Sequence, residues 1–487
     1  MQYNHTVEPF SHQKLHFEEH RETPAWGLLW EQGTAKTKPV IDTAAWLYKE
    51  GKIDGLLVVA PPGVERNWNS DEIPTHLVPE VAIDTRVEVF NSKKKGTKDH
   101  KWRMESIRSH KGLAVLLISY PAFMTKVGKE AVWKFLRDRR CLYVLDESHN
   151  IKSPSAKKTI SIIASSKYAP YRRILTGTPM AIGPFDLYSQ IRFLDGNFWK
   201  DREIEGAVAF RQRYGRWFTA ADCKAVHGYD PGFDKLIEYA NLDELAEYLK
   251  QITDRVLKED VLDLPPKLFQ KKYVEMSPEQ SAAYAQLRQE FFYEFEDGHV
   301  IDAELAIVRL LRFQQVLCGY LPGGEEEPVR ELPGRNPRME AMEELRDEIH
   351  TPTIVWARFR NDVTKIMDLL GEDAVRYDGT VDADQAEINK KAFQGGHKKW
   401  FVGTTAKGGP GLTLHRAKTV IYYNNTFKLI DRLQSEDRAH RAGMDENAVN
   451  YIDLVVPGSI DELIVQNLRD KVEIASVITG DRLKEWI

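Results

Sequence analysis

A glycine-containing stretch near the start of the chain has the residue types of a phosphate-binding loop. It reads Gly27-Leu-Leu-Trp-Glu-Gln-Gly33-Thr34-Ala35-Lys36-Thr37, a short apolar run followed by a glycine turn and a Lys-Thr pair that opens a predicted helix. In such a loop, backbone N–H groups face the phosphates, the lysine binds the terminal phosphates and the threonine hydroxyl ligates Mg²⁺. Ala35 stands where this loop normally has glycine, so an ordinary loop with a surface lysine is the alternative.

Two adjacent acids end a second apolar segment, Cys141-Leu-Tyr-Val-Leu-Asp146-Glu147. Two carboxylates side by side at the end of a buried strand repel each other unless a cation is near. In a nucleotide site the first acid holds Mg²⁺, and the second orients or deprotonates the attacking water. The alternative is structural, because an aspartate at a strand end often caps the next helix. Taken with Lys36 and Thr37, the pair predicts a site for ATP and Mg²⁺.

Two series of short apolar segments are expected to position these residues. Each segment is rich in Val, Ile or Leu and alternates with a helix-compatible stretch, which predicts parallel sheets covered by crossover helices. The first series is residues 56–60, 87–90, 113–119, 142–146 and 173–176. The second series is residues 353–357, 374–377, 400–404, 419–424 and 451–455. Two α/β lobes are therefore expected.

The region between the two series has a different pattern. Residues 182–312 lack buried-strand runs and are predicted to be helical, for example at 242–255 and 278–296. Residues 321–337 (LPGGEEEPVRELPGRNP) are rich in proline, glycine and glutamate, which indicates a hinge. The predicted organisation is lobe one at 1–181, helical insertions and a connector at 182–320, a linker at 321–337 and lobe two at 338–487.

Composition limits the class of protein. The chain has 487 residues, with 68 Lys and Arg against 73 Asp and Glu, 42% apolar residues and no signal-peptide pattern. This composition excludes collagen-like, disordered and membrane proteins, and the mild acidity does not exclude a local basic groove. Three scattered cysteines predict no disulfide framework and a reducing compartment. Cys223 and His227 are too few ligands for zinc, so Mg²⁺ is the only metal expected.

The segment Asp146-Glu147-Ser148-His149-Asn150-Ile151-Lys152 resembles the DESH-type motif of the Swi/Snf-family DNA translocases, members of helicase superfamily two. The strongest match is Gln434-Ser-Glu-Asp437-Arg438-Ala-His-Arg441-Ala-Gly443, which is similar to the family's QxxDRxHRxG signature. Matches at residues 255–267, 277–284 and 311–318 separate the chain from DEAD-box RNA helicases, which lack such insertions. The resemblance covers about residues 10–460 and implies an α/β fold of two RecA-like parallel-sheet lobes with helical insertions between them.

The resemblance implies a role for each matching residue. Catalysis is assigned to Lys36, Glu147, Arg438 and Arg441, and Mg²⁺ binding to Thr37 and Asp146. ATP binding is assigned to Gln13, which reads the adenine edge, and to Gly33, Thr34, Lys36, Thr37, Gly411 and Gln434. Coupling of hydrolysis to movement is assigned to Thr176, Thr178 and Asp437. DNA binding is assigned to Pro61, Ser119, Tyr120, Arg358, Thr404, Thr405 and Lys407.

The chain departs from the family pattern at a few positions. Ala35 replaces the loop glycine, which costs on the order of 1 kcal/mol if the position needs positive φ. The other departures are Thr413 for Asn, Ala406 for Arg (with Lys407 able to supply the charge), Phe427 for Trp and Met444 for Gln. None of them removes a group that the chemistry requires.

The division of the site between two lobes predicts a motor. Arg438 and Arg441 lie about 400 residues from Lys36 in the sequence, so they reach the γ-phosphate only if lobe two closes on lobe one. The rigid guanidinium fork matches phosphate oxygens, and such an arginine finger contributes roughly 10³ to 10⁵ in rate. The alternative for both arginines is surface ion pairing with Glu436 or Asp437.

Three functions fit the sequence. The first is a DNA-dependent ATPase that translocates along double-stranded DNA and remodels DNA or protein–DNA complexes, gripping phosphates with little sequence preference. The second is a strand-separating, annealing or branch-remodelling DNA helicase acting on single-stranded or branched DNA. The third is a DNA-binding regulator with an impaired ATPase, which Ala35 keeps open. The lysine-rich stretch at 93–103 adds to a DNA track or is a solvated loop.

The expected setting follows from what the sequence lacks. There is no recognisable chromatin-reading, nuclease or methyltransferase module and no apolar run near the ~18 residues that span a bilayer. We expect the cytoplasm of a bacterial or phage-infected host cell and no membrane association, and the sequence names no protein partner.

Overall fold

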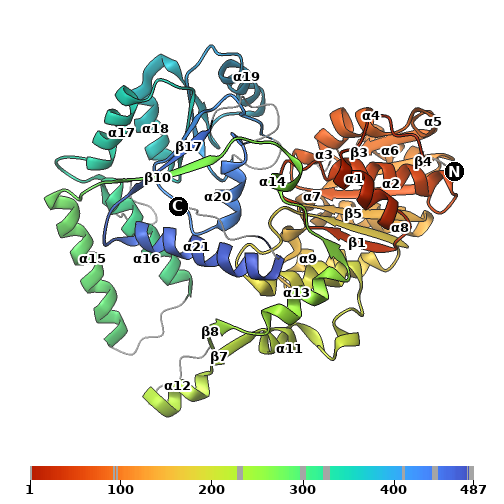
Figure 1. Cartoon of the computed structure of the whole chain (residues 1–487), viewed down its shortest axis with the longest axis horizontal. Coiled ribbons are helices and arrows are strands. Elements are labelled where there is room, and N and C mark those ends of the chain that lie inside the picture. The colour runs from red at the N-terminus through yellow and green to blue at the C-terminus, as the bar shows by residue number, and fades with distance from the viewer. Residues whose placement is uncertain are drawn as a thin grey trace. The chain divides into compact units, whose positions relative to one another are not determined.

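The computed structural model describes residues 3–91, 94, 97–227, 234–296, 303–321, 330–407, 412–440, 448–479 and 481 (Figure 1). The chain forms two compact units. Unit one contains Met1–Gly215, Tyr239–Asp263 and Ile474–Arg482, and unit two contains Arg216–Glu238, Leu264–Glu473 and Leu483–Ile487. The residues predicted as one helical region are thus divided between the units.

Unit one is built on a parallel sheet of seven strands in the order β3-β4-β2-β5-β6-β1-β9. Its strands are β1 (Ala25–Leu28), β2 (Gly55–Ala60), β3 (Thr85–Val89), β4 (Leu113–Ser119), β5 (Cys141–Asp146), β6 (Tyr171–Leu175) and β9 (Thr253–Asp254). Its helices are α1 (Ser11–His20), α2 (Thr37–Lys49), α3 (Val64–Asn67), α4 (Ile73–His76), α5 (Pro79–Ala82), α6 (Lys98–Arg108), α7 (Tyr120–Met124), α8 (Lys126–Asp138), α9 (Lys157–Ser166), α10 (Leu187–Leu194), α11 (Gly206–Arg213), α13 (Leu242–Lys250) and α14 (Lys258–Val261).

Unit two is built on a parallel sheet of six strands in the order β10-β17-β16-β13-β15-β14. Its strands are β10 (Lys267–Tyr273), β13 (Thr353–Ala357), β14 (Ala374–Tyr377), β15 (Trp400–Thr404), β16 (Thr419–Tyr422) and β17 (Val449–Val455). Its helices are α15 (Pro278–Glu296), α16 (Ala303–Leu317), α17 (Pro337–Glu348), α18 (Arg360–Leu370), α19 (Ala383–Gln394) and α20 (Leu429–Glu436), and α21 (Ile460–Thr479) begins there.

Smaller elements complete the description. The pairs β7 (Gly215–Phe218) with β8 (Lys235–Tyr239), and β11 (Tyr320–Leu321) with β12 (Arg330–Glu331), form two-stranded sheets, and α12 (Ala220–His227) follows β7. Four strands, β7 to β10, therefore lie in the region that the sequence predicted to be helical. That prediction was wrong for these strands because they are short or half-exposed and lack an unbroken apolar run.

The sheets are buried on both faces, as the predicted apolar runs require. Along β2, Leu57 and Val59 pack in one apolar cluster, whereas Leu56 and Val58 pack in another. Successive strand side chains point to opposite faces, so each run of buried residues fills two cores at once. The strands predicted in both series are confirmed, and the fold is two parallel-sheet α/β lobes.

Strand order determines which loops become neighbours. In unit one β5, β6 and β1 are adjacent and parallel, so the segments that follow them emerge at the same edge of the sheet. In unit two the same holds for β16, β13 and β15. The carboxyl edge of an open parallel sheet is where ligands bind in this class of fold.

Two further features concern the whole described chain. Cys141, Cys223 and Cys318 are free thiols, and all three are buried. Among the described residues, no helix combines the length and the apolar character that crossing a membrane requires.

Candidate functional site

The predicted phosphate loop follows β1 and runs into α2. The Lys36 ammonium donates to the backbone oxygens of Trp30 and Glu31, at 2.9 Å each. Gly33 has φ 86° and Ala35 has φ 55°, both in the left-handed region. Ala35 therefore has the positive φ that favours glycine, and its side chain destabilises the loop by on the order of 1 kcal/mol relative to glycine.

Helix α1 braces this loop through its side chains. Gln13 is buried; its Oε1 accepts from the Phe10 N–H and its Nε2 donates to the Ala35 oxygen, both at 2.8 Å. A ring nitrogen of His12 lies 3.0 Å from the Thr34 oxygen. In this structure the Gln13 amide fixes the position of the loop, and its contact with adenine stays a prediction.

Phe10 is a candidate functional residue that the sequence did not reveal. Its side chain is 51% exposed, and its ring is stacked on His12 with centroids 5.8 Å apart and planes 9° apart. Because His12 contacts the predicted phosphate loop, the exposed ring of Phe10 lies next to that loop. The signal was present as an apolar ring in the Pro-Phe-Ser-His-Gln segment, three residues before Gln13.

The paired acids lie at the end of β5. Asp146 accepts a hydrogen bond from the Trp68 indole at 2.9 Å. Burial, and then the neighbouring charge of Glu147, raise the pKa of Asp146 to about 6. Glu147 has φ 52°, an unfavourable backbone conformation of the kind that clusters at functional sites. Its Oε1 accepts from the Gln32 amide at 3.3 Å, so the acid and the phosphate loop are directly connected.

Two of the predicted coupling residues, Thr176 and Thr178, are connected to Glu147. His149 Nδ1 lies 3.3 Å from Glu147 Oε2 and 3.3 Å from the Thr176 hydroxyl. The Thr176 hydroxyl in turn accepts from the Thr178 N–H at 3.2 Å. Thr178 is buried, and its hydroxyl has no hydrogen-bond partner among the described residues. Polar contacts therefore run from the end of β5 to the segment after β6.

The segment after β6 also lies against the phosphate loop. A Cβ added at Gly177 would come within 2.9 Å of the Gln32 backbone nitrogen, closer than real Cβ atoms approach. Glycine is required here because the two backbones touch. A movement of the phosphate loop would therefore displace residues 176–178 through steric contact as well as through hydrogen bonds.

Asp254 in β9 is a half-buried anchor that the sequence did not reveal. Its carboxylate accepts from the Trp26 and Trp30 indoles at 2.9 Å each and lies 3.0 Å from His16 Nδ1. Burial acts to raise the pKa of Asp254, but the bonds from His16 and the two indoles outweigh it and hold the pKa below its ordinary value. Because β9 pairs with β1, this anchor brings the residues after it to the phosphate loop.

Two of those residues are cations. The Arg255 guanidinium donates to the backbone oxygens of Leu29 and Gly177 and pairs with Asp481 at 2.7 Å. Lys258 is buried, and its backbone N–H donates to Glu31 Oε2 at 2.6 Å. A Cβ added at Gly33 would lie 3.2 Å from Lys258 Cε and 3.8 Å from its Nζ. A second ammonium therefore stands over the glycine turn.

This arrangement fits a Mg²⁺-bound triphosphate. Burial lowers the pKa of Lys36; the charges of Glu147 and Asp146 oppose this shift, and the charges of Arg255 and Lys258 add to it. A polyanion bound beside Lys36, Arg255 and Lys258 would favour the charged form of Lys36. The raised pKa of Asp146 shows that the paired acids favour a cation, and Asp146 with the Thr37 hydroxyl would hold Mg²⁺. Among the described residues, no group of three or more His, Cys, Asp or Glu side chains is arranged to hold a metal ion.

The predicted DNA contacts of unit one differ in accessibility. Ser119 ends β4 and is half-buried, and Pro61 follows β2 and is buried. Tyr120 is 2% exposed, and its hydroxyl donates to the Asp146 backbone oxygen at 3.0 Å. The role that the structure displays for Tyr120 is to hold the acid-bearing turn, and its contact with DNA stays a prediction.

The predicted DNA contacts of unit two lie at the carboxyl edge of its sheet. Arg358 follows β13; its N–H donates to Asn424 Oδ1 at 2.6 Å, and its guanidinium donates to Gln314. Thr404 ends β15 and Thr405 follows it. The Lys407 ammonium is held by backbone oxygens of Asp378, at 2.6 Å, and Val381. The sheet thus brings these residues together, with Arg358 and Lys407 each held in a local hydrogen-bond network.

The signature segment lies on and after α20. Gln434 and Arg438 are buried, and Arg438 donates to the Leu412 oxygen at 3.1 Å. Asp437 is half-buried, 3.6 Å from the Lys267 ammonium. Arg441 and Gly411 lie outside the described residues.

Arg432 anchors this segment and was missed by sequence reasoning. Its guanidinium donates to both oxygens of Asp453 and, through Nε, to Glu436 at 2.7 Å. All three side chains are buried. Arg432 is two residues before Gln434 in the signature, but its partner on β17 is not visible in a local pattern.

Comparison with known protein families agrees with this geometry. A family model described as SNF2-related domain matches residues 16–318, and one described as helicase conserved C-terminal domain matches residues 338–443. This chain belongs to the SNF2-related family. The family consists of ATP-hydrolysing enzymes of helicase superfamily two, so the resemblance inferred from the motifs is confirmed.

Several curated SNF2 relatives are similar over much of the chain. The transcription regulatory protein SNF2 of Saccharomyces cerevisiae is 26% identical over 479 residues, covering 91% of this chain and 26% of that protein. The TATA-binding protein-associated factor MOT1 of the same yeast is 25% identical, covering 70% and 20%, respectively. The probable ATP-dependent DNA helicase CHR12 of Arabidopsis thaliana is 25% identical, covering 91% and 39%. This chain thus spans between 20% and 39% of the length of these three relatives.

A solved structure was also found, the Sulfolobus solfataricus SWI2/SNF2 ATPase core in complex with dsDNA. It is 22% identical with a TM-score of 0.41, covering 99% of this chain and 95% of that one.

Proposed function

We propose that this chain is a DNA-stimulated ATPase that translocates along double-stranded DNA and remodels DNA or protein–DNA complexes. The observation that carries the proposal is that Lys36, after β1, and Asp146 and Glu147, at the end of β5, lie at one edge of the sheet on either side of β6, in a chain of the SNF2-related family. Lys36 is the phosphate ligand in this proposal, because its ammonium is held by backbone oxygens of the loop and lies near both the paired acids and the cations Arg255 and Lys258.

Each remaining residue of unit one has a defined part in the proposal. Mg²⁺, when bound, supplies charge neutralisation at the transferring phosphate, and Asp146 with Thr37 would hold it. Glu147 orients the attacking water, since its carboxylate is fixed between Gln32 and His149. His149 and Thr176 carry the state of that acid to the segment after β6.

Unit two supplies the arginines in this proposal. The sequence signature assigns Arg438 and Arg441 to the γ-phosphate when the two lobes close, which would make hydrolysis conditional on closure. Residues at the carboxyl edge of its sheet, Arg358 and Lys407 among them, would contact DNA phosphates. Contacts of this kind carry no base information, so binding would weaken with salt and show little sequence preference.

The central experiment measures ATP turnover without nucleic acid and with single-stranded DNA, duplex DNA or RNA. We expect duplex DNA to stimulate turnover, and we expect Lys36→Ala and Glu147→Gln to abolish it. Equal turnover in all four conditions would remove the motor proposal. Arg441→Ala should retain ATP binding with little hydrolysis, and loss of binding would contradict a finger role.

A second experiment separates translocation from strand separation. A translocase displaces a triplex-forming third strand from duplex DNA and leaves the duplex paired, whereas a helicase releases a labelled strand from a fork. The names of relatives such as CHR12 include helicase activity, so both substrates are required.

The third function, a DNA-binding regulator with an impaired ATPase, is supported by one observation, the positive φ of Ala35. It predicts that Ala35→Gly raises a low turnover severalfold. An unchanged rate in that variant, together with robust DNA stimulation of the wild type, would exclude this alternative.

A further inference from the structure

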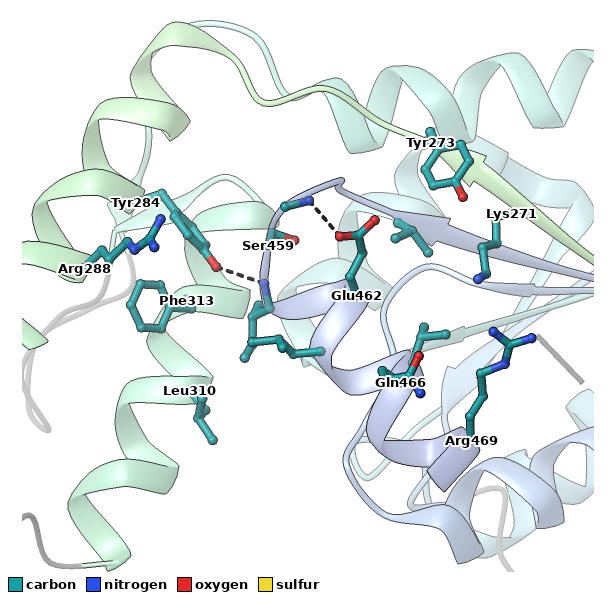
Figure 2. Close-up of a pocket in the computed structure, with 15 residues that line it drawn as sticks. Lys271, Tyr273, Tyr284, Arg288, Leu310, Phe313, Ser459, Glu462, Gln466 and Arg469 are labelled. Atoms are coloured by element: carbon teal, nitrogen blue, oxygen red, sulfur yellow. Dashed lines mark hydrogen bonds between the residues drawn. The ribbon is translucent and has the colours of Figure 1, made fainter. Parts of the chain in front are cut away.

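Unit two contains a pocket that none of the assigned functions uses. Its volume is about 730 Å³, within the range of about 300–1,000 Å³ that is typical of ligand sites. Its walls come from β10, α15, α16, the end of β17 and the first turns of α21 (Figure 2). All of these lining residues belong to unit two, so the pocket is defined without reference to unit one.

The floor of the pocket is apolar and rigid. The rings of Tyr284 and Phe313 pack with centroids 4.8 Å apart and planes 49° apart. The Tyr284 hydroxyl accepts from the Ile460 N–H at 2.9 Å, which ties α15 to the start of α21 (Figure 2). Val455 and Val465 are 1% and 4% exposed and belong to the same lining. Such a floor favours an apolar side chain over water.

The rim of the pocket is basic. Lys271 of β10, Arg288 of α15 and Arg469 of α21 line it. Figure 2 shows Lys271 and Arg469 directed toward each other at one end, with Arg288 beside Tyr284 at the other. The single acid of the lining, Glu462, accepts from the Gly458 N–H at 2.9 Å and so caps α21. The lining therefore carries three positively charged side chains and one negatively charged side chain.

We propose that this pocket binds an acidic peptide segment that inserts one bulky apolar side chain onto the Tyr284–Phe313 floor. The acidic side chains of the segment would pair with Lys271, Arg288 and Arg469. Interfaces of this type derive their affinity from a buried apolar anchor and their orientation from charge complementarity at the rim.

The geometry favours a peptide over nucleic acid. A duplex presents phosphates to a surface and would leave the apolar floor facing water. A single-stranded base needs an open aromatic face to stack on. Phe313 is only 9% exposed, and Tyr284 is tilted against it by 49°, so the two rings do not form one flat platform on which bases could stack.

The test uses the full chain and a fluorescein-labelled synthetic peptide in which one phenylalanine is flanked on both sides by glutamates. We expect a saturable rise in anisotropy that weakens with salt. Replacing the phenylalanine by alanine, or the glutamates by lysines, should remove binding. The double variant Lys271→Glu with Arg469→Glu should weaken affinity about tenfold or more.

Two controls make the outcome decisive. Lys391→Glu, which reverses an exposed lysine of α19 in the same unit, should leave affinity unchanged. Lys36→Ala should also bind the peptide normally, so failure of the ATPase proposal would not remove this one. The inference is overturned if the acidic peptide does not bind, if the double variant binds it equally well, or if the alanine-substituted peptide binds as tightly. Competition by an oligothymidine with the same dependence on Lys271 and Arg469 would reassign the pocket to nucleic acid.

Discussion

Asp146→Asn is expected to make unit one more stable while it disables the enzyme. The structure holds Asp146 in surroundings that raise its pKa from 3.8 to about 6, with burial as the main cause. The difference of about 2 pKa units corresponds to roughly 3 kcal/mol, by which ionisation favours the unfolded chain at neutral pH. Asparagine copies the neutral acid and keeps an oxygen for the Trp68 indole, so it removes this penalty.

The pH dependence gives the prediction its sign. The folded pKa lies above the unfolded value, so wild-type stability falls as pH rises from about 3.8 to about 6 and then levels off. The advantage of Asp146→Asn should therefore be full above pH 6, about half near pH 5 and absent near pH 4. For a unit of this size, 3 kcal/mol corresponds to a rise in Tm of roughly 6–12 °C.

The assay is thermal unfolding of the wild type and Asp146→Asn between pH 4 and pH 8, with and without Mg²⁺ and ATP. Glu130→Gln is the matched control, because Glu130 is an exposed acid on α8 and its loss should change nothing. Adding Mg²⁺ and ATP should stabilise the wild type and not Asp146→Asn. A Tm difference that is negative or independent of pH would refute the electrostatic reasoning.

Three other substitutions test separate parts of the structure. Ala35→Gly should stabilise unit one by up to about 1 kcal/mol, because relief of the strain from positive φ exceeds the added entropy of the unfolded chain. Urea unfolding measures this difference, and a loss of stability would show that Ala35 is not strained. Arg432→Met should destabilise unit two by about 3–5 kcal/mol, because it leaves the buried carboxylate of Asp453 without its ion-pair partner and leaves Glu436 paired with Lys267 alone. A urea midpoint close to that of the wild type would show that the cluster is dispensable. Lys258→Ala should weaken binding of a fluorescent ATP analogue at least about fivefold, since a cation over Gly33 is lost. The control Lys250→Ala, which removes an exposed ion pair with Glu247, should leave the affinity unchanged. Equal affinities of Lys258→Ala and the wild type would exclude a phosphate contact from Lys258.

The sequence predicted most of the two sheets because their strands are buried on both faces. Strands such as β4 and β13 are unbroken apolar runs, a pattern typical of parallel strands covered by helices on each side. Strand β10 escaped prediction because it pairs on one side only, with β17, and alternates exposed and half-buried residues among three lysines. Edge strands carry such charges to avoid pairing with other chains, and this hides them from a search for apolar runs.

The site was predictable where chemistry is local and unpredictable where it is not. The Lys36-Thr37 and Asp146-Glu147 pairs are adjacent in sequence, so their residue types alone indicated phosphate and metal binding. Asp254 has no such signal, because its partners Trp26, Trp30 and His16 lie between 224 and 238 residues away. The strand order β5-β6-β1, which joins the two pairs, likewise appears only in the folded sheet.

The burial of all three cysteines makes this chain convenient for labelling. A thiol reacts as its thiolate, and burial raises the pKa of Cys141 and Cys318, which keeps both protonated at neutral pH. The side chain of Cys223 is only 6% exposed. A cysteine introduced on the surface of each unit would therefore be the preferred target of a maleimide dye. A donor and acceptor attached in this way would report, molecule by molecule, how the distance between the units changes during an ATP cycle.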